Sequence, residues 1–195
     1  LRSNDYYSAR NYASRLIGDK LVFYTPLYLS VDDDKDLFRS FPALRKWHDG
    51  AKDSEFQRLV SAPKVYRPLM ASESLTLHSV TVCDLSKREL SCEANAVLGA
   101  PGRVFYVSQG SVFVWVTEWQ QLGAGQKQAS LVYRMPLDGS APSVLHTHGA
   151  PVDQFSFLED ASGHLNVVVR ADSAGDAMWA SEASEGAVAL LRVPL

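Results

Sequence analysis

Short segments in which apolar and polar residues alternate, or in which β-branched residues follow one another, are separated by turn residues. Residues 104–108 and 111–118 flank a Gln-Gly turn, and residues 154–159 and 164–170 flank a turn that ends at Gly163. A period of two over four to eight residues, bounded by Gly, Asn, Asp or Ser, is typical of a β-strand. The pattern therefore predicts β-hairpins and an all-β fold.

The hairpins recur along the chain. Gly-Ala-Pro at residues 99–101 returns 50 residues later at residues 149–151, and an aromatic residue follows each at the same distance, Phe105 or Phe155. Self-similarity at a period of this size indicates a repeat architecture.

A third element also recurs, as VYRMPL from Val132 and as LLRVPL from Leu190, and a long Ala/Ser/Gly-rich connection over residues 171–186, expected to be a surface loop, precedes the second copy. Fourth strands are predicted over residues 89–98 and 143–146. The same pattern one unit earlier predicts strands over residues 15–17, 20–29 and 75–84, with a Gly-Asp turn between the first two.

Each unit is thus expected to contain four short antiparallel strands, which is typical of the blade of a β-propeller. We predict a partial, open propeller of about three blades within residues 1–195, with blades over residues 8–98, 99–148 and, incompletely, 149–195. Because unpaired strand edges are avoided in natural proteins, we expect the remaining blades from the same parent protein or from a partner chain.

The first unit carries an insertion over residues 30–72 with no strand pattern of its own. It contains a helix-like segment over residues 36–48. Two interpretations stay open. The insertion forms a recognition surface, or four apolar residues at a spacing of three form the buried stripe of a helix that covers the first blade: Phe38, Phe41, Leu44 and Trp47.

Composition and charge narrow the function classes. The chain is 46% apolar and 21% charged, and 19 Lys and Arg against 22 Asp and Glu give a net charge of −3. This charge offers no electrostatic footprint for nucleic acid. The longest apolar runs have the length of a strand, so no membrane span is predicted.

The two cysteines are placed symmetrically about a polar turn. If Lys87-Arg88 form a two-residue turn, or if the loop is longer but symmetric, Cys83 lies directly opposite Cys92. A non-hydrogen-bonded antiparallel pair has Cα atoms about 4.5 Å apart, within the range of about 4.4–6.8 Å that a disulfide needs. We predict a Cys83–Cys92 disulfide and an oxidising compartment, with two buried thiols as the alternative.

Two groups of residues are candidates for a metal. His146 and His148 are two apart, so they share one face of a strand and could both reach one ion, although no third ligand is assignable. Asp32, Asp34 and Asp36 belong to an acidic run that could bind calcium, but the run lacks the Gly and the closing Glu of a twelve-residue calcium loop. A solvated outer strand explains the two histidines as well, and a solvated loop or N-capping of the helix-like segment explains the acidic run.

Catalytic chemistry is not predicted. The chain contains no nucleophile elbow, phosphate loop, dinucleotide fingerprint or zinc-protease motif. Carboxylates near strand ends offer a glycosidase-type pair, as any acid-rich chain does: Asp153, Glu159 and Glu118. His78 is expected to be a hydrogen-bonded structural residue. Core packing is the preferred interpretation of the clustered aromatic residues over a sugar-binding face: Phe105, Tyr106, Phe113, Trp115, Trp119 and Tyr133.

Five segments resemble bacterial secreted proteins of uncharacterised function that have a C-terminal β-propeller distantly related to WD repeats. The segments are SRLIGDKLVFY at 14–24, LHSVTVCDLS at 77–86, GRVFYVS at 102–108, YRMPLDG at 133–139 and VDQFSF at 152–157. The resemblance implies a secreted, periplasmic or envelope location and a propeller longer than this chain, and it supplies no catalytic residue.

The sequence therefore predicts a non-catalytic binding or scaffolding module of a secreted or envelope β-propeller, with a protein or glycan ligand and no required cofactor. Two alternatives stay open. The first is a propeller hydrolase or lyase whose site lies in blades outside this chain. The second is a calcium-dependent adhesion module centred on the acidic run at Asp32, Asp34 and Asp36.

Overall fold

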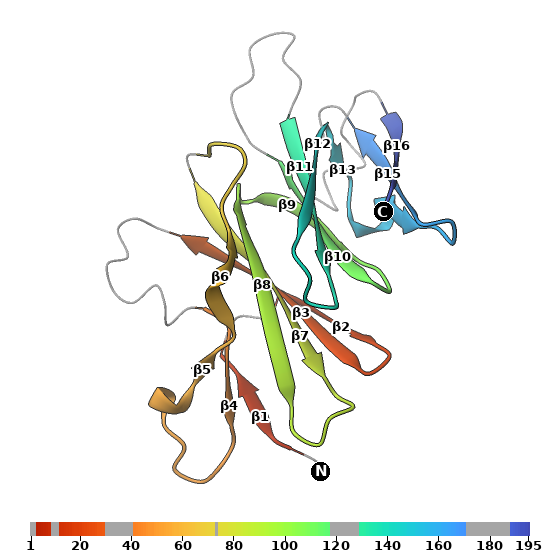
Figure 1. Ribbon diagram of the computed structural model, residues 1–195. Helices are drawn as coiled ribbons and strands as arrows, with labels where there is room; N and C mark the ends of the chain where they lie inside the picture. The colour runs from red at the N-terminus through yellow and green to blue at the C-terminus, as the bar shows by residue number, and fades with distance from the viewer. Residues whose placement is uncertain (1–2, 9–11, 30–40, 73, 118–128, 171–187) are drawn as a thin grey trace. The chain divides into compact units, whose positions relative to one another are not determined.

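A computed structural model describes residues 3–8, 12–29, 41–72, 74–117, 129–170 and 188–195. This described part consists of β-strands (Figure 1) with two short 3-10 helices, η2 (Asp53–Glu55) and η3 (Gln154–Ser156), so the prediction of an all-β fold is confirmed. The chain forms two compact units. The first is Leu1–Gly99 with Leu137–Ala141, and the second is Ala100–Pro136 with Pro142–Leu195.

The main sheet of the first unit has five strands in the order β2-β3-β7-β8-β6. Four of them pair antiparallel in chain order as predicted, and the fifth, β6, comes from the insertion and runs parallel to β8. The expectation that the insertion contributes no strand is therefore wrong. The strands are β2 (Ala13–Ile17), β3 (Lys20–Leu29), β6 (Val60–Tyr66), β7 (Leu75–Asp84) and β8 (Ser91–Gly99).

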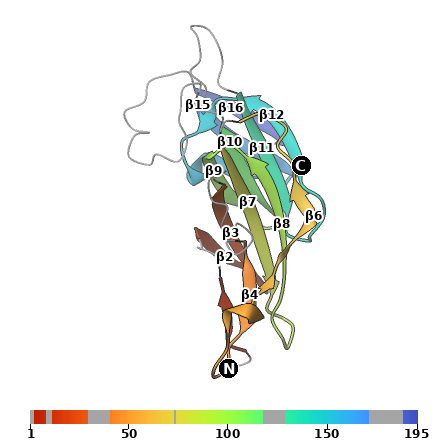
Figure 2. The same cartoon turned by 90° about the vertical axis from the view of Figure 1, so that its left-hand side faces the viewer.

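The helix expected over residues 36–48 is also wrong where the structure describes it. Residues 36–40 lie outside the described residues, and Ala43–Lys46 form strand β4. This strand, also labelled in Figure 2, pairs with β1 (Asp5–Tyr7) on one side and with β5 (Gln57–Arg58) on the other (Figure 1). The helical propensity of the Ala-Leu-Arg-Lys segment is overruled because two flanking strands take up its backbone hydrogen-bonding groups.

Strand β1 covers one face of the main sheet in the first unit. The ring of Tyr7 stacks on Phe23 with 4.6 Å between centroids. Its hydroxyl lies 3.1 Å from the Thr25 hydroxyl and 3.2 Å from the Thr81 hydroxyl. Burial raises the pKa of the Tyr7 phenol above its ordinary value, and the two threonine hydrogen bonds lower it in part.

The described part of the insertion covers the same face with apolar side chains. The cluster joins residues of the insertion to residues of β3, β7 and β8, namely Phe41, Leu59, Val60 and Val65 with Leu27, Leu29, Leu77, Ala94, Ala96 and Leu98. Of the expected helical stripe, Phe38 lies outside the described residues, Phe41 packs in this cluster, and Trp47 is 52% exposed. The covering predicted for the insertion is present in the described residues, and Phe41 and Leu59, which lie next to strands β4 and β6, contribute to it.

The second unit contains a sheet of four strands in the order β12-β11-β10-β9. All seven residues of β10 are buried, so both faces of this strand are covered, as alternating bulky residues on both faces predict. The strands are β9 (Gly102–Val107), β10 (Ser111–Thr117), β11 (Ala129–Pro136) and β12 (Ser143–His148).

The third sheet also belongs to the second unit and is built around β15. Strands β13 and β14 pair with one edge of β15, and β16 pairs with its other edge. Among the described residues no strand pairs with the far edge of β16. The strands are β13 (Ala150–Pro151), β14 (Phe157–Glu159), β15 (His164–Arg170) and β16 (Val188–Pro194).

The two sheets of the second unit pack face to face. The indole of Trp115 meets the ring of Phe157 edge-on at 6.1 Å, and its N–H donates to the carbonyl of Gly149 at 3.1 Å. The shared core is Val104, Phe113, Trp115 and Val132 from one sheet and Ala150, Phe157, Leu165, Val167 and Val169 from the other. The core-packing interpretation of Phe113 and Trp115 is confirmed.

The predicted disulfide is present. Cys83 lies opposite Cys92 in the β7–β8 pair, with 4.0 Å between the Cα atoms, and the sulfurs are bonded. The ladder ends at Asp84 and Ser91, so the connection is a symmetric six-residue loop and not a two-residue turn at Lys87-Arg88. Lys-Arg lacks the positive-φ residues of a two-residue hairpin turn, whereas Gly18-Asp19 between β2 and β3 supplies one, Gly18 at φ 55°.

Candidate functional site

The described part of the insertion presents a compact surface on the sheet β1-β4-β5. The guanidinium carbon of Arg45 lies 5.4 Å from the ring centroid of Tyr6 and 4.7 Å from that of Phe56. Trp47 follows two residues later, and its backbone N–H donates to the Asn4 carbonyl at 2.8 Å, which continues the β1–β4 ladder. We call Tyr6, Arg45, Trp47 and Phe56 the aromatic–arginine surface.

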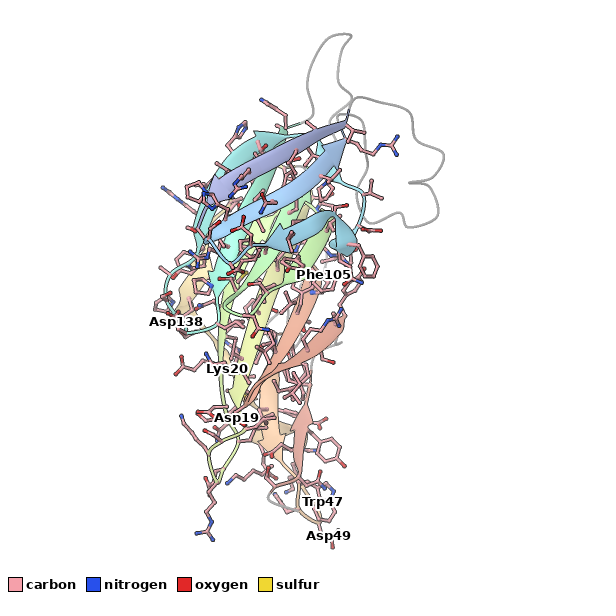
Figure 3. All side chains as sticks on the ribbon, turned by 90° about the vertical axis from the view of Figure 1, so that its right-hand side faces the viewer. Asp19, Lys20, Trp47, Asp49, Phe105 and Asp138 are labelled. Carbon is pink, nitrogen blue, oxygen red and sulfur yellow. A yellow bond between two sulfur atoms is a disulfide. The ribbon has the colours of Figure 1, made fainter. Side chains whose placement is uncertain are left out.

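Exposure differs across the aromatic–arginine surface. Tyr6 is 45% exposed and Trp47 is 52% exposed, whereas the side chain of Arg45 is only 14% exposed. Arg45 also forms a long ion pair with Asp53, at 3.7 Å. The arginine is therefore held by stacking, and the surface around it is open. Figure 3 shows Trp47 beside Asp49 at the turn that follows β4.

An ion pair lies beside this surface. The Nε2 atom of His48 is 2.5 Å from Oε2 of Glu55, while Oε1 of Glu55 accepts the backbone N–H of Lys52 at 2.8 Å. The hydrogen bond to Glu55 raises the pKa of His48 above 6.5. The Lys52 N–H, followed by His48, lowers the pKa of Glu55. No residue spacing in the sequence predicted this pair.

The metal candidates fall into two groups. Asp32, Asp34 and Asp36 lie outside the described residues, so the calcium prediction stays a prediction. His146 and His148 lie on β12, both exposed, with ring centroids 5.5 Å apart. Among the described residues no group of three or more His, Cys, Asp or Glu is placed to hold a metal ion.

The carboxylate candidates have local structural surroundings. Oδ1 of Asp153 accepts the backbone N–H of Phe155 at 2.8 Å and so caps η3. Glu159 ends β14, and its Oε2 is buried with no hydrogen-bond partner among the described residues. Glu118 lies outside the described residues. These contacts provide no acid–base pair.

His78 and Tyr133 are buried inside the fold. His78 is fully buried in β7, and its Nδ1 lies 2.8 Å from the hydroxyl of Tyr24, as expected for a structural histidine. Tyr133 is also buried, Phe105 and Tyr106 are half-buried, and Trp119 lies outside the described residues.

One local motif was missed at the sequence level. At three corners an aspartate Oδ1 accepts both the backbone N–H and the hydroxyl of the serine two residues later, at 2.9–3.0 Å and 2.6–2.7 Å. These hydrogen bonds lower the pKa of each carboxyl. The Asp-x-Ser spacing was the available signal. The pairs are Asp84 with Ser86, Asp138 with Ser140, and Asp160 with Ser162.

The Asp138 corner is held inside the first unit by side chains of its main sheet. Three carbonyls of the turn accept them: Leu137 from Lys20 Nζ at 2.9 Å, Gly139 from Lys64 Nζ at 2.9 Å, and Ser140 from Asn95 Nδ2 at 3.2 Å. Lys20 and Asp138 are labelled in Figure 3.

Comparison with models of known protein families, with curated proteins and with solved structures finds no match for this chain. Within the described residues, no helix combines the length and the hydropathy needed to cross a membrane. The fold and the disulfide define an all-β, disulfide-bonded protein.

Proposed function

We propose that this chain is a non-catalytic binding or scaffolding module of a secreted or envelope β-propeller protein, and that the aromatic–arginine surface binds a protein ligand. The observation that carries the proposal is the stack of Arg45 between Tyr6 and Phe56 beside the half-exposed Trp47. Trp, Tyr and Arg are the residues that contribute most to binding energy at protein interfaces.

The strands around this surface favour a rigid binding site. Strands β1 and β4 pair antiparallel, with Asp5 opposite Lys46 and Tyr7 opposite Leu44. The ring of Tyr7 also stacks on Phe23 of the main sheet. A surface that is ordered before binding loses less conformational entropy when it binds.

A protein ligand is favoured over a glycan because of which ring faces are open. Arg45 already occupies one face of Tyr6 and one face of Phe56, so these rings are less available for stacking on a sugar. The ring of Trp47, 52% exposed, is left as a stacking platform. The Cys83–Cys92 disulfide supports the extracytoplasmic location, since such bonds persist in oxidising compartments.

The test is Trp47→Ala in the parent protein, with the adhesion or growth phenotype of the deletion strain and the thermal stability measured together. Because Trp47 is half-exposed and outside the core clusters, we expect loss of the phenotype with an unchanged Tm. Leu16→Ala, at a 66% exposed position on β2, is the matched control. Retention of the phenotype in Trp47→Ala would overturn the proposal.

A further inference from the structure

The outer face of the third sheet carries four exposed apolar side chains, next to the polar side chains of Asn166, Arg170 and Arg192. Val168 is 42% exposed, Val188 65% and Leu190 67%, and Leu158 on the neighbouring strand β14 is 59% exposed. Strand register places Leu190 directly opposite Val168. In Figure 3 this sheet is turned toward the viewer. We call these four residues the outer face.

The neighbouring sheet shows what covers the corresponding positions. Trp115 and Val168 each stand five residues after the glycine of the preceding turn, and Val132 and Leu190 each begin the recurring third element. The register pairs Trp115 with Val132, just as it pairs Val168 with Leu190. The first pair is buried, at 0% and 4% exposed, beneath the third sheet. The same interface continued by one sheet would cover Val168 and Leu190.

A second copy of this chain does not offer the required covering face. In the third sheet the face that covers its neighbour carries Val167, the fourth residue of β15. The fourth residue of β3 in the first unit is Phe23, and Tyr7 already covers it. Head-to-tail association through these faces is therefore blocked among the described residues.

We propose that the outer face docks one further antiparallel sheet of the same repeat, carried by the same parent polypeptide outside residues 1–195. We place the covering sheet on the same polypeptide because of chain order. The sheet that covers Trp115 and Val132 is the one that follows them along the chain. The occupant presents an aliphatic face like that of Leu165 and Val167. This inference rests on the proposed propeller repeat, but it does not depend on the aromatic–arginine surface.

The test is the double variant Val168→Glu/Leu190→Glu, made both in the 195-residue chain and in the full-length parent. In the 195-residue chain both carboxylates are solvated, so Tm is expected to change by less than about 2 °C. In the parent they are buried without partners, so Tm is expected to fall by about 5 °C or more. Leu16→Glu, at an equally exposed leucine on β2, is expected to leave Tm unchanged in both.

Three outcomes would overturn the inference. An unchanged Tm of the double variant in the parent shows that the face is not buried there. A parent polypeptide without residues beyond this chain removes the occupant. A 195-residue chain that is dimeric by light scattering, and that the double variant dissociates, assigns the face to a second copy. None of these outcomes involves the Trp47→Ala phenotype, so failure here is distinguishable from failure of the proposed function.

Discussion

The main sheet of the first unit and the sheet built around β15 in the second unit differ in whether one face is covered by other residues. In the first, β1 and the insertion cover the face that carries Phe23 and Leu77. In the sheet around β15, Val168 and Leu190 stay exposed on a face that also carries Asn166, Arg170 and Arg192. The strands of both are predicted from the same alternation, so a strand pattern establishes which residues share a face but not whether that face is covered.

The largest expected effect compares a covered leucine with an open one. Leu77 is 1% exposed within its cluster, so Leu77→Ala is expected to lower the free energy of unfolding by about 2–4 kcal/mol. Leu190 is 67% exposed, and in the 195-residue chain Leu190→Ala is expected to lower it by less than about 0.5 kcal/mol. Urea unfolding of the two variants measures the difference. Equal losses would contradict the assignment of covered and open faces.

The second comparison concerns the disulfide, because both of its cysteines lie in the first unit. Cys83→Ser/Cys92→Ser opens a closed loop with a sequence separation of 9 and is expected to cost about 2–3 kcal/mol, by the loop-entropy relation. Thermal unfolding with and without a reductant measures this in the wild-type protein. The double variant, which has no bond to reduce, is the control and should not respond to the reductant.

Removing a single oxygen atom, the Tyr7 hydroxyl, should weaken the attachment of strand β1 to the main sheet. Tyr7→Phe keeps the stack on Phe23 but removes the hydroxyl that bonds Thr25 and Thr81, and is expected to cost about 1–2 kcal/mol. Tyr6→Phe, at a 45% exposed ring on the same strand, is the matched control and should cost less than about 0.5 kcal/mol. A similar loss in both variants would mean that the buried hydroxyl is not what matters.

The smallest expected effect is a pH dependence at His48 and Glu55. The pKa of His48 is raised, so its contribution to stability is present below 6.5 and fades as the pH rises through the folded pKa. The pKa of Glu55 is lowered, so its contribution is present above 4.5 and fades as the pH falls through the folded pKa. Titration of His48 by NMR in wild type and Glu55→Gln should show its pKa falling in the variant.

The sequence predicted the strands well and the covering elements poorly. The bounds of β3, β7 and β15 agree with the expected ranges, because hydrophobic alternation and turn residues are local signals. The partners of β4 lie on distant segments, β1 and β5, and no local pattern reports such pairing. For the same reason the helix expected over residues 36–48 was wrong.

The candidate site was foreseen only as a region. The sequence placed recognition in the insertion and named Trp47 within a helical stripe. The stack of Arg45 on Tyr6 joins residues 39 positions apart in the sequence, and the His48–Glu55 pair depends on the turn around Lys52. Contacts of this kind depend on pairing between distant segments, which no local pattern in the sequence indicates. The Cys83–Cys92 bond was predictable because its two strands are joined by one symmetric loop.

Hydrogen exchange in the full-length parent tests the contrast between the two sheets most directly. We expect amides of β7 to exchange slowly both in the 195-residue chain and in the parent, because β7 is a central strand with pairs on both edges. The β16 amides that pair with β15 should exchange faster than those of β7 in the 195-residue chain and become more protected in the parent, where the further sheet lies on the outer face. Equally fast exchange of β16 in both proteins would contradict the account.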